Sequence, residues 1–138
     1  MRLNLRSTGL LERITFCGAV FSGGGEGKRF LDLPWVKRQI LETLGFIPYS
    51  GTLNLRLSEE SVKGRKLLEK AHSIRVYPAE GYCNGVLIKA SIRALECAIV
   101  VPEIADYPMN VLEIIASVNL REKLQLENGG EVTVTVNL

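Results

Sequence analysis

Histidine and cysteine are scarce in this sequence, which has one histidine and three cysteines among its 138 residues. A metal cage of imidazoles or a Ser-His-Asp triad would have to be built on His72 alone, and we expect this residue to have no catalytic role. The cysteines, Cys17, Cys83 and Cys97, are odd in number, widely spaced and free of any C-x-x-C motif. We therefore expect reduced core thiols, and neither a disulfide framework nor a zinc site.

Runs of like charge and long apolar stretches are also absent. The formal net charge is +2 and no segment is dense in lysine and arginine, which gives no support for binding to nucleic acid or to a membrane surface. No apolar run approaches the roughly 20 residues that cross a bilayer, and the N-terminus lacks the apolar core of a signal peptide. With 46% hydrophobic and 23% charged residues, we expect a soluble, cytoplasmic, single globular domain over residues 1–138.

Short β-strands dominate the hydrophobic patterning. Apolar and polar side chains alternate over residues 132–138 after the turn at Asn128-Gly129-Gly130, and residues 98–101 form a short apolar run that Pro102 ends. Strands are predicted at residues 13–21, 29–33, 74–76, 85–92, 98–101 and 132–138.

Helices are few. The strongest pattern covers residues 34–44, with Pro34 at the first helical position and Gly45 just beyond the end. Residues 58–71 and 119–124 indicate shorter helical segments, the former with Ser58 as its N-cap. Many closely spaced strands with one or two short helices predict a mainly β protein that closes into a barrel, rather than a βαβ sheet.

The first candidate binding motif is Ser22–Arg29, which we call the glycine-rich segment. Four glycines in five residues free the backbone to turn its N–H groups toward one point, and Lys28 and Arg29 add positive charge beside it. A Walker A loop does not fit, because Arg29 occupies the Ser/Thr position, and a dinucleotide fingerprint fails because Lys28 replaces its last glycine. Both motifs also need a following helix, whereas residues 29–33 read as a strand. The segment is either a phosphate cradle or a flexible turn.

The second motif is the run from Gly45 to Asn54, in which Pro48 and Gly51 form a turn before a strand. Residues two apart on a strand share a face, so the side-chain oxygens of Thr52 and Asn54 can point at one ion. Hard neutral oxygens suit Mg²⁺, which takes few protein ligands and keeps water and phosphate for the rest. The plainer interpretation is that both side chains line the solvated face of an ordinary strand.

The third motif runs from Asn110 to Arg121. Glu113 is a carboxylate among apolar neighbours and needs a hydrogen-bond or charge partner, or its pKa rises. It could instead lie on the exposed face of an amphipathic segment. Arg121 could reach a phosphate or pair with Glu122.

Together the three motifs resemble the CTP-dependent riboflavin kinase family of archaea. The resemblance runs in order from about Leu11 to Val136, and G-F-x-P-Y-x-G-T-L-N is its most distinctive part. It implies a closed six-stranded cradle-loop barrel, which transfers the γ-phosphoryl group of CTP to the 5′-hydroxyl of riboflavin to give FMN and CDP. Some members of the family carry an N-terminal winged-helix domain, which we do not expect here because the barrel motifs begin so near residue 1. The oligomeric state does not follow, and a monomer is compatible with the sequence.

The resemblance also implies roles for individual residues. Thr52 and Asn54 would hold magnesium, Glu113 would bind on the flavin side and could accept the hydroxyl proton, and Lys28 would stabilise charge. CTP would be bound by Gly23, Gly24, Gly25, Glu26, Gly27, Lys28, Val118, Asn119, Leu120 and Arg121.

The chain departs from the family pattern most seriously in the P-x-R-T-x-Y segment, whose threonine contacts flavin. Here Ala105 occupies that position and Ile104 replaces the arginine. Loss of one hydrogen bond typically costs about 0.5–1.5 kcal/mol, so flavin affinity is expected to fall several-fold. Two alternatives to the kinase follow: a non-catalytic barrel that senses nucleotide or flavin, and a kinase of this fold that acts on another alcohol. The intact glycine-rich segment and Thr52–Asn54 pair favour an enzyme.

Overall fold

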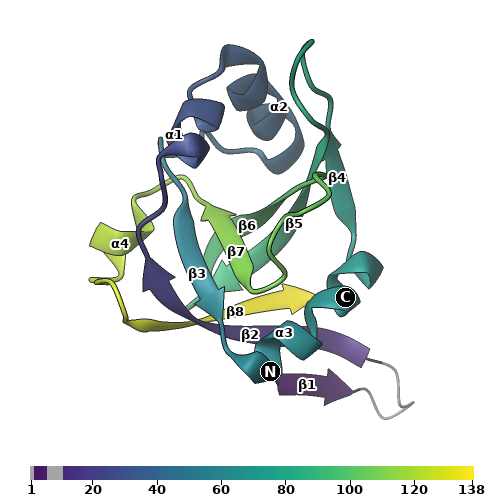
Figure 1. Ribbon diagram of the computed structural model, residues 1–138, viewed down its shortest axis with the longest axis vertical. Coiled ribbons are helices and arrows are strands. Elements are labelled where there is room, and N and C mark those ends of the chain that lie inside the picture. The colour runs from purple at the N-terminus through teal and green to yellow at the C-terminus, as the bar shows by residue number, and fades with distance from the viewer. Residues whose placement is uncertain (1, 6–10) are drawn as a thin grey trace.

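The computed structural model describes residues 2–5 and 11–138, and its main feature is a closed antiparallel β-barrel (Figure 1). Six strands form the ring in the order β2-β3-β7-β6-β5-β8, and β8 closes it by pairing with β2. Strands β1 and β4 extend the sheet beside β2 and β5. This confirms the mainly β, six-stranded barrel. The strands are β1 (Arg2–Leu5), β2 (Leu11–Phe21), β3 (Leu53–Leu57), β4 (Ser73–Val76), β5 (Gly85–Ile92), β6 (Leu95–Pro102), β7 (Val111–Ile115) and β8 (Glu131–Asn137).

The helices lie in the connections between strands. The predicted helix over residues 34–44 is confirmed as α2 (Pro34–Leu44), which ends at Gly45. The predicted helical segment over residues 58–71 is divided at Gly64 into a short α-helix and a 3₁₀ helix, and Ser58 caps the first by accepting a hydrogen bond from the Ser61 backbone. These two helices are α3 (Glu59–Lys63) and the 3₁₀ helix η1 (Arg65–Lys70). The remaining helices are α1 (Glu26–Leu31) and α4 (Leu120–Lys123).

The prediction of a strand at residues 29–33 is wrong, because the chain enters α1 directly from the glycines. With six residues, α1 is too short to show a helical period in the sequence. Leu31 is fully buried against α2, while Leu33 is extended, as a residue before proline must be, and caps α2 at Pro34. A helix therefore does begin within the glycine-rich segment, although the residues of the segment still fail the Walker A and dinucleotide patterns.

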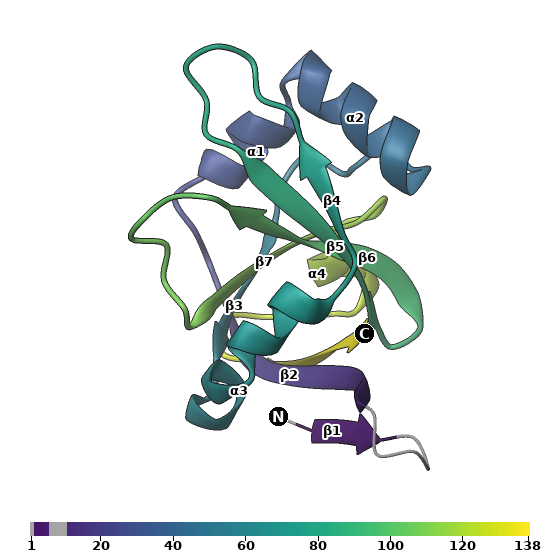
Figure 2. The ribbon, with the colours of Figure 1, turned by 90° about the vertical axis from the view of Figure 1, so that its right-hand side faces the viewer.

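Two apolar clusters lie on the two faces of the barrel wall. Because side chains alternate along a strand, Leu53, Leu55 and Leu57 of β3 all belong to the cluster inside the barrel. Val100 and Ile115 belong instead to the outer cluster, which α1 and α2 cover. Figures 1 and 2 show these two helices at one end of the molecule and α3 at the other. The outer face of β3 and β7 beside α1 is thus left for polar side chains.

The three cysteines are free, but only one is a core residue. Cys97 is buried in the barrel, and burial raises the pKa of its thiol to about 12. The expectation of core thiols is wrong for Cys17 and Cys83, which are exposed; Cys17 lies on the outward side of β2 and Cys83 in the β4–β5 loop. In the described part of the chain, no helix has the length and apolar character needed to span a bilayer.

Candidate active site

Four strands bring one residue each into a row across the barrel wall. Phe21 of β2 pairs with Asn54 of β3, Asn54 with Glu113 of β7, and Glu113 with Val100 of β6. Directly paired residues in antiparallel strands point to the same face. Val100 belongs to the outer cluster, so Asn54 and Glu113 are neighbours on the outer face of the wall. The backbone register alone therefore places an amide next to a carboxylate.

Thr52 and Asn54 lie on this outer face, as the alternation predicted. The Thr52 hydroxyl donates to Asn54 Oδ1 at 3.2 Å, and both side chains are half-buried. Two hard, neutral oxygens this close together fit a magnesium ion that keeps water and phosphate as its other ligands. The described residues contain no cluster of three or more His, Cys, Asp or Glu side chains that could form a closed metal cage.

The glycine-rich segment packs directly onto this pair of side chains. A Cβ atom on Gly27 would lie 2.5 Å from Thr52 Oγ1, and one on Gly23 would lie 2.5 Å from Asn54 Nδ2. Both distances are far below van der Waals contact, so a side chain at either position would displace the pair. Glycine is thus required here for close approach.

A cavity of about 670 Å³ opens where these elements meet. It is lined on one side by the glycine-rich segment and on the other by strands β3 and β7. The glycines therefore face the same cavity as the side-chain oxygens of Thr52 and Asn54, which follow the turn at Pro48 and Tyr49 (the Pro-Tyr turn). Its polar lining residues are Ser22, Glu26, Lys28, Thr52, Asn54, Arg56, Tyr107, Glu113 and Arg121.

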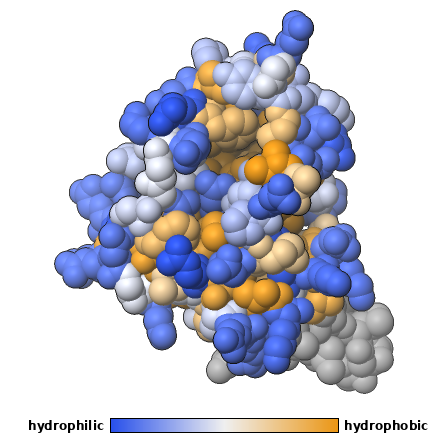
Figure 3. All heavy atoms as spheres, viewed as in Figure 1, coloured by the Kyte–Doolittle hydropathy of each residue, from blue (hydrophilic) through white to orange (hydrophobic). Residues whose placement is uncertain are grey.

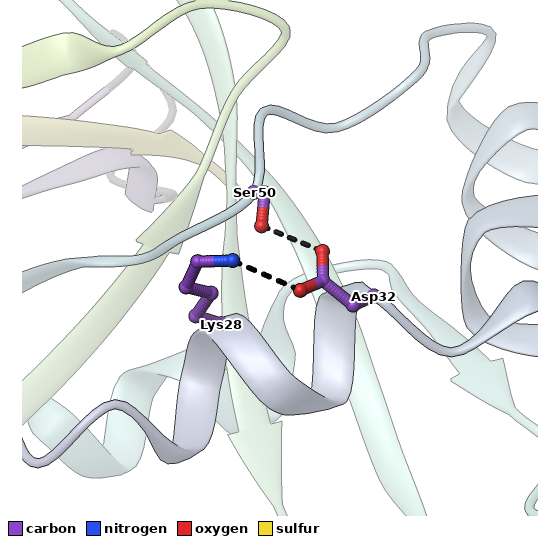
Figure 4. A network of polar contacts seen from close by, with 3 residues as sticks. All are labelled: Lys28, Asp32 and Ser50. Atoms are coloured by element: carbon purple, nitrogen blue, oxygen red, sulfur yellow. Dashed lines mark hydrogen bonds and ion pairs between the residues drawn. The ribbon is translucent and has the colours of Figure 1, made fainter.

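An exposed contact ties α1 to the turn before β3 (Figure 4). Lys28 Nζ lies 3.1 Å from Asp32 Oδ2, and the Ser50 hydroxyl donates to Asp32 Oδ1 at 2.6 Å. The hydrogen bond from Ser50, followed by that from Lys28, lowers the pKa of Asp32 below its ordinary value. Lys28 lines the cavity, and its ammonium group donates a hydrogen bond to Asp32.

Glu113 has the partner that its apolar surroundings required. The hydroxyl of Tyr107, from the β6–β7 loop, donates to Glu113 Oε2 at 2.6 Å. Burial and this bond to a carboxylate both raise the pKa of Tyr107, so its hydroxyl stays protonated and remains a donor. Within the described residues, the other carboxylate oxygen of Glu113 accepts no hydrogen bond, and the residue is part of the cavity lining.

Arg121 lies at the edge of the same cavity, at the start of α4. Its Nη2 donates to the Phe21 carbonyl at 3.0 Å and to Asn128 Oδ1 at 2.8 Å, so Glu122 is not its partner. Val118, Asn119 and Leu120 line a smaller cavity of about 220 Å³, which shares Gly51, Thr52 and Arg121 with the large one.

Asn119 caps α4, its Oδ1 accepting from the Glu122 backbone at 3.3 Å. Its Nδ2 donates to the Tyr49 hydroxyl at 3.2 Å. The segment from Val118 to Arg121 is thereby tied to the Pro-Tyr turn.

Ala105 lies apart from the other predicted site residues. It is exposed in the β6–β7 loop and lines a separate cavity of about 310 Å³, whereas Glu113 lines the large cavity. The two cavities share Pro102, Ile104 and Tyr107. The two residues assigned to flavin therefore line different cavities that meet at Tyr107.

Sequence reasoning missed Arg56 and Tyr107. Arg56 lies two residues after Asn54 on the same face of β3, and its guanidinium sits 4.4 Å from the centroid of the Phe21 ring. The period of the strand could have identified it. Tyr107 carries no local signal, because its place beside Glu113 depends on the conformation of the loop.

An apolar recess adjoins the polar cavity. It has a volume of about 170 Å³, lies between α1 and the wall, and shares Glu26, Gly27, Thr52, Pro102 and Glu113 with the large cavity. Apolar surface is visible in the hollow below α1 and α2 in Figure 3. The apolar lining of the recess comes from Phe30, Leu31, Val100 and Pro102.

The family model and the similar proteins that match this chain all point to one family. The family model of the CTP-dependent riboflavin kinase domain, also described as domain of unknown function DUF120, matches residues 20–136. The riboflavin kinase of Archaeoglobus fulgidus is 41% identical over 125 residues, which are 88% of this chain and 54% of that protein. The riboflavin kinase of Pyrobaculum aerophilum is 39% identical over 135 residues, 93% of this chain and 63% of that protein.

A third relative is covered more fully. The riboflavin kinase of Saccharolobus solfataricus is 39% identical over 132 residues, which are 91% of this chain and 75% of that protein. The chain spans between about half and two thirds of the length of the other two relatives. Because the family model covers most of the chain, the chain belongs to the CTP-dependent riboflavin kinase domain family.

Proposed function

We propose that this protein transfers the γ-phosphoryl group of CTP to the 5′-hydroxyl of riboflavin, giving FMN and CDP. One observation carries the proposal: the glycine-rich segment rests on Thr52 and Asn54, and Glu113 is the cross-strand neighbour of Asn54. A triphosphate held by the segment then has its terminal phosphate beside the carboxylate. The family membership and the riboflavin kinases among the relatives support this reaction.

Phosphoryl transfer requires little covalent work from a protein, so alignment and charge neutralisation must supply most of the catalysis. In this reaction the bond from the 5′-oxygen to the γ-phosphorus forms while the bond to the bridging β-oxygen breaks. The backbone N–H groups of Gly23, Gly24, Gly25, Glu26 and Gly27 and the Lys28 ammonium stabilise the triphosphate. The free oxygen of Glu113 orients the riboflavin hydroxyl and takes its proton.

Thr52 and Asn54 would hold a magnesium ion, which when bound neutralises charge on the phosphate oxygens. Arg121 and the segment Val118–Leu120 bind the remainder of the nucleotide in the adjoining cavity. Free cysteines agree with a reducing compartment, and we propose that the reaction takes place in the cytoplasm.

The reaction can be tested directly. The purified protein is incubated with riboflavin, Mg²⁺ and either CTP or ATP, and FMN is separated by chromatography. We expect FMN with CTP and little or none with ATP. Saturable CTP binding without any FMN would favour the nucleotide-sensing barrel, and CTP turnover that riboflavin does not stimulate would favour another alcohol as acceptor.

A further inference from the structure

Arg65, the first residue of η1, is a buried cation that the proposed chemistry does not use. Its exposed fraction is 7%, and its Nε is buried without a hydrogen-bond partner. In the described part of the chain its guanidinium forms no ion pair and no hydrogen bond. Removal from water lowers the pKa of Arg65. The side chain nevertheless stays charged, because arginine does not deprotonate in proteins.

An unpaired buried charge is costly, so its presence calls for a reason. Arg65 lies within electrostatic range of Tyr107. The Tyr107 hydroxyl donates to Glu113, and in the described residues no hydrogen bond joins its oxygen to the guanidinium of Arg65. The folded protein thus holds a planar array of donors ready for an acceptor that the chain itself does not provide.

The guanidinium lines the cavity of about 310 Å³ that contains Ala105. Apolar walls are formed by Leu68, Val86, Ile88, Val101, Ile104 and Met109, and the polar side chains of Lys66, Glu69 and Ser73 also line the cavity. This cavity meets the large one at Pro102, Ile104 and Tyr107. A ligand whose hydroxyl end lies at Glu113 can therefore extend past Tyr107 toward Arg65.

We infer that Arg65 binds the carbonyl edge of the riboflavin ring and is a determinant of acceptor specificity. This inference rests on the proposed function. The isoalloxazine ring has a flat, largely apolar body with carbonyl oxygens along one edge, which matches apolar walls and a fork of N–H donors. Ile104 and Ala105 offer no side-chain donor in the same cavity, so the buried donor there is Arg65.

The experiment uses two Arg65 variants and a neighbouring control. Arg65→Met removes the donors, Arg65→Gln keeps a shorter, polar side chain without the charge, and Lys70→Met removes an exposed cation of the same 3₁₀ helix that does not line the cavity. Three quantities are measured: the affinity for lumiflavin, which has the ring but no ribityl chain; the KM values for riboflavin and CTP; and the melting temperature.

We expect both Arg65 variants to bind lumiflavin about ten-fold more weakly or worse, the range for a lost charged hydrogen bond. The KM for riboflavin should rise equally, while the KM for CTP stays unchanged. The Lys70→Met protein should keep the lumiflavin affinity and both KM values of the unmodified protein. Unaltered lumiflavin affinity in either folded Arg65 variant overturns the inference. So does an equal loss for riboflavin and CTP together with a lower melting temperature, because that pattern indicates a structural role.

Failure of the inference and failure of the proposed activity are distinguishable. FMN formation by the unmodified protein with the same riboflavin KM in Arg65→Met overturns the role of Arg65 alone. Arg65-dependent binding of lumiflavin without formation of FMN overturns the kinase activity alone. Absence of both flavin binding and FMN overturns the two together.

Discussion

Arg121 donates a hydrogen bond to the backbone carbonyl of Phe21, 3.0 Å away and 100 positions earlier in the sequence. The acceptor is the last residue of β2, where the chain leaves the barrel for the glycine-rich segment. A second bond, from Arg121 to Asn128, joins the same point to the turn before β8. The side chain thus fixes the base of the proposed phosphate-binding segment as well as lining the cavity.

Replacement of Arg121 by methionine is expected to weaken CTP binding. The change removes a cation from the cavity and also the hydrogen bond that holds the end of β2. The Kd for CTP should therefore rise about ten-fold or more. Isothermal titration with CTP measures the effect. Lys123→Met, on an exposed position of the same helix, is the control and should bind CTP as the unmodified protein does. Equal affinity in the Arg121 variant would contradict the assignment.

Asn54→Ala should lower the rate of FMN formation by about 100-fold or more while the protein stays folded. The variant removes one of the two proposed metal ligands and leaves the barrel interior intact, because Asn54 lies on the outer face. Turnover is measured at saturating CTP, and folding by circular dichroism. Asn110→Ala, in the exposed β6–β7 loop, provides a comparison with the same chemical change. Near-normal turnover in Asn54→Ala would remove the metal assignment.

Gly27→Ala is expected to disturb Thr52. A methyl group at this position would meet the Thr52 hydroxyl at 2.5 Å, and such overpacking costs about 1–3 kcal/mol of unfolding free energy. In Gly24→Ala the nearest atoms belong to the mobile end of the Glu26 side chain, so its free energy of unfolding should stay close to that of the unmodified protein. Urea unfolding compares the two. Equal stability of both variants would show that the segment does not pack as described.

The contact of Asp32 with Ser50 and Lys28 predicts a pH-dependent contribution to stability. The folded protein lowers the pKa of Asp32, so the contribution is present above the unfolded value of 3.8 and is lost as the pH falls through the lower, folded value. Asp32→Asn should therefore be less stable than the unmodified protein near about pH 7, and the difference should shrink near about pH 3. Urea midpoints at the two pH values provide the measurement; a difference that grows in acid has the wrong sign.

Short-range periodicity was sufficient to predict a mainly β barrel and one half of the site, whereas β1 and β7 were not predicted and the number of six strands followed from the family resemblance. Thr52 and Asn54 could be placed together because residues two apart on a strand always share a face. The α2 helix was equally accessible, since Pro34 and Gly45 mark its ends. The six-residue α1 was missed because its apolar residues fit a strand as well as a single helical turn.

The remaining features depend on contacts between distant parts of the chain. Tyr107 reaches Glu113 only because the β6–β7 loop folds back over the wall, and Arg121 meets Phe21 only once the barrel has closed. The burial of Arg65 depends on how a 3₁₀ helix rests on neighbouring strands. No local pattern in the sequence encodes these long-range arrangements.

The row of paired residues across β2, β3, β7 and β6 lies on rigid strands, whereas other residues that line the cavities lie on a loop. Asn54 and Glu113 are fixed by the ladder of a closed sheet, in which each strand is held on both sides. Ile104, Ala105 and Tyr107 sit on a loop that the ladder does not constrain. Changes in that loop can therefore exchange one acceptor alcohol for another during evolution while the proposed phosphoryl-transfer chemistry on the wall stays the same.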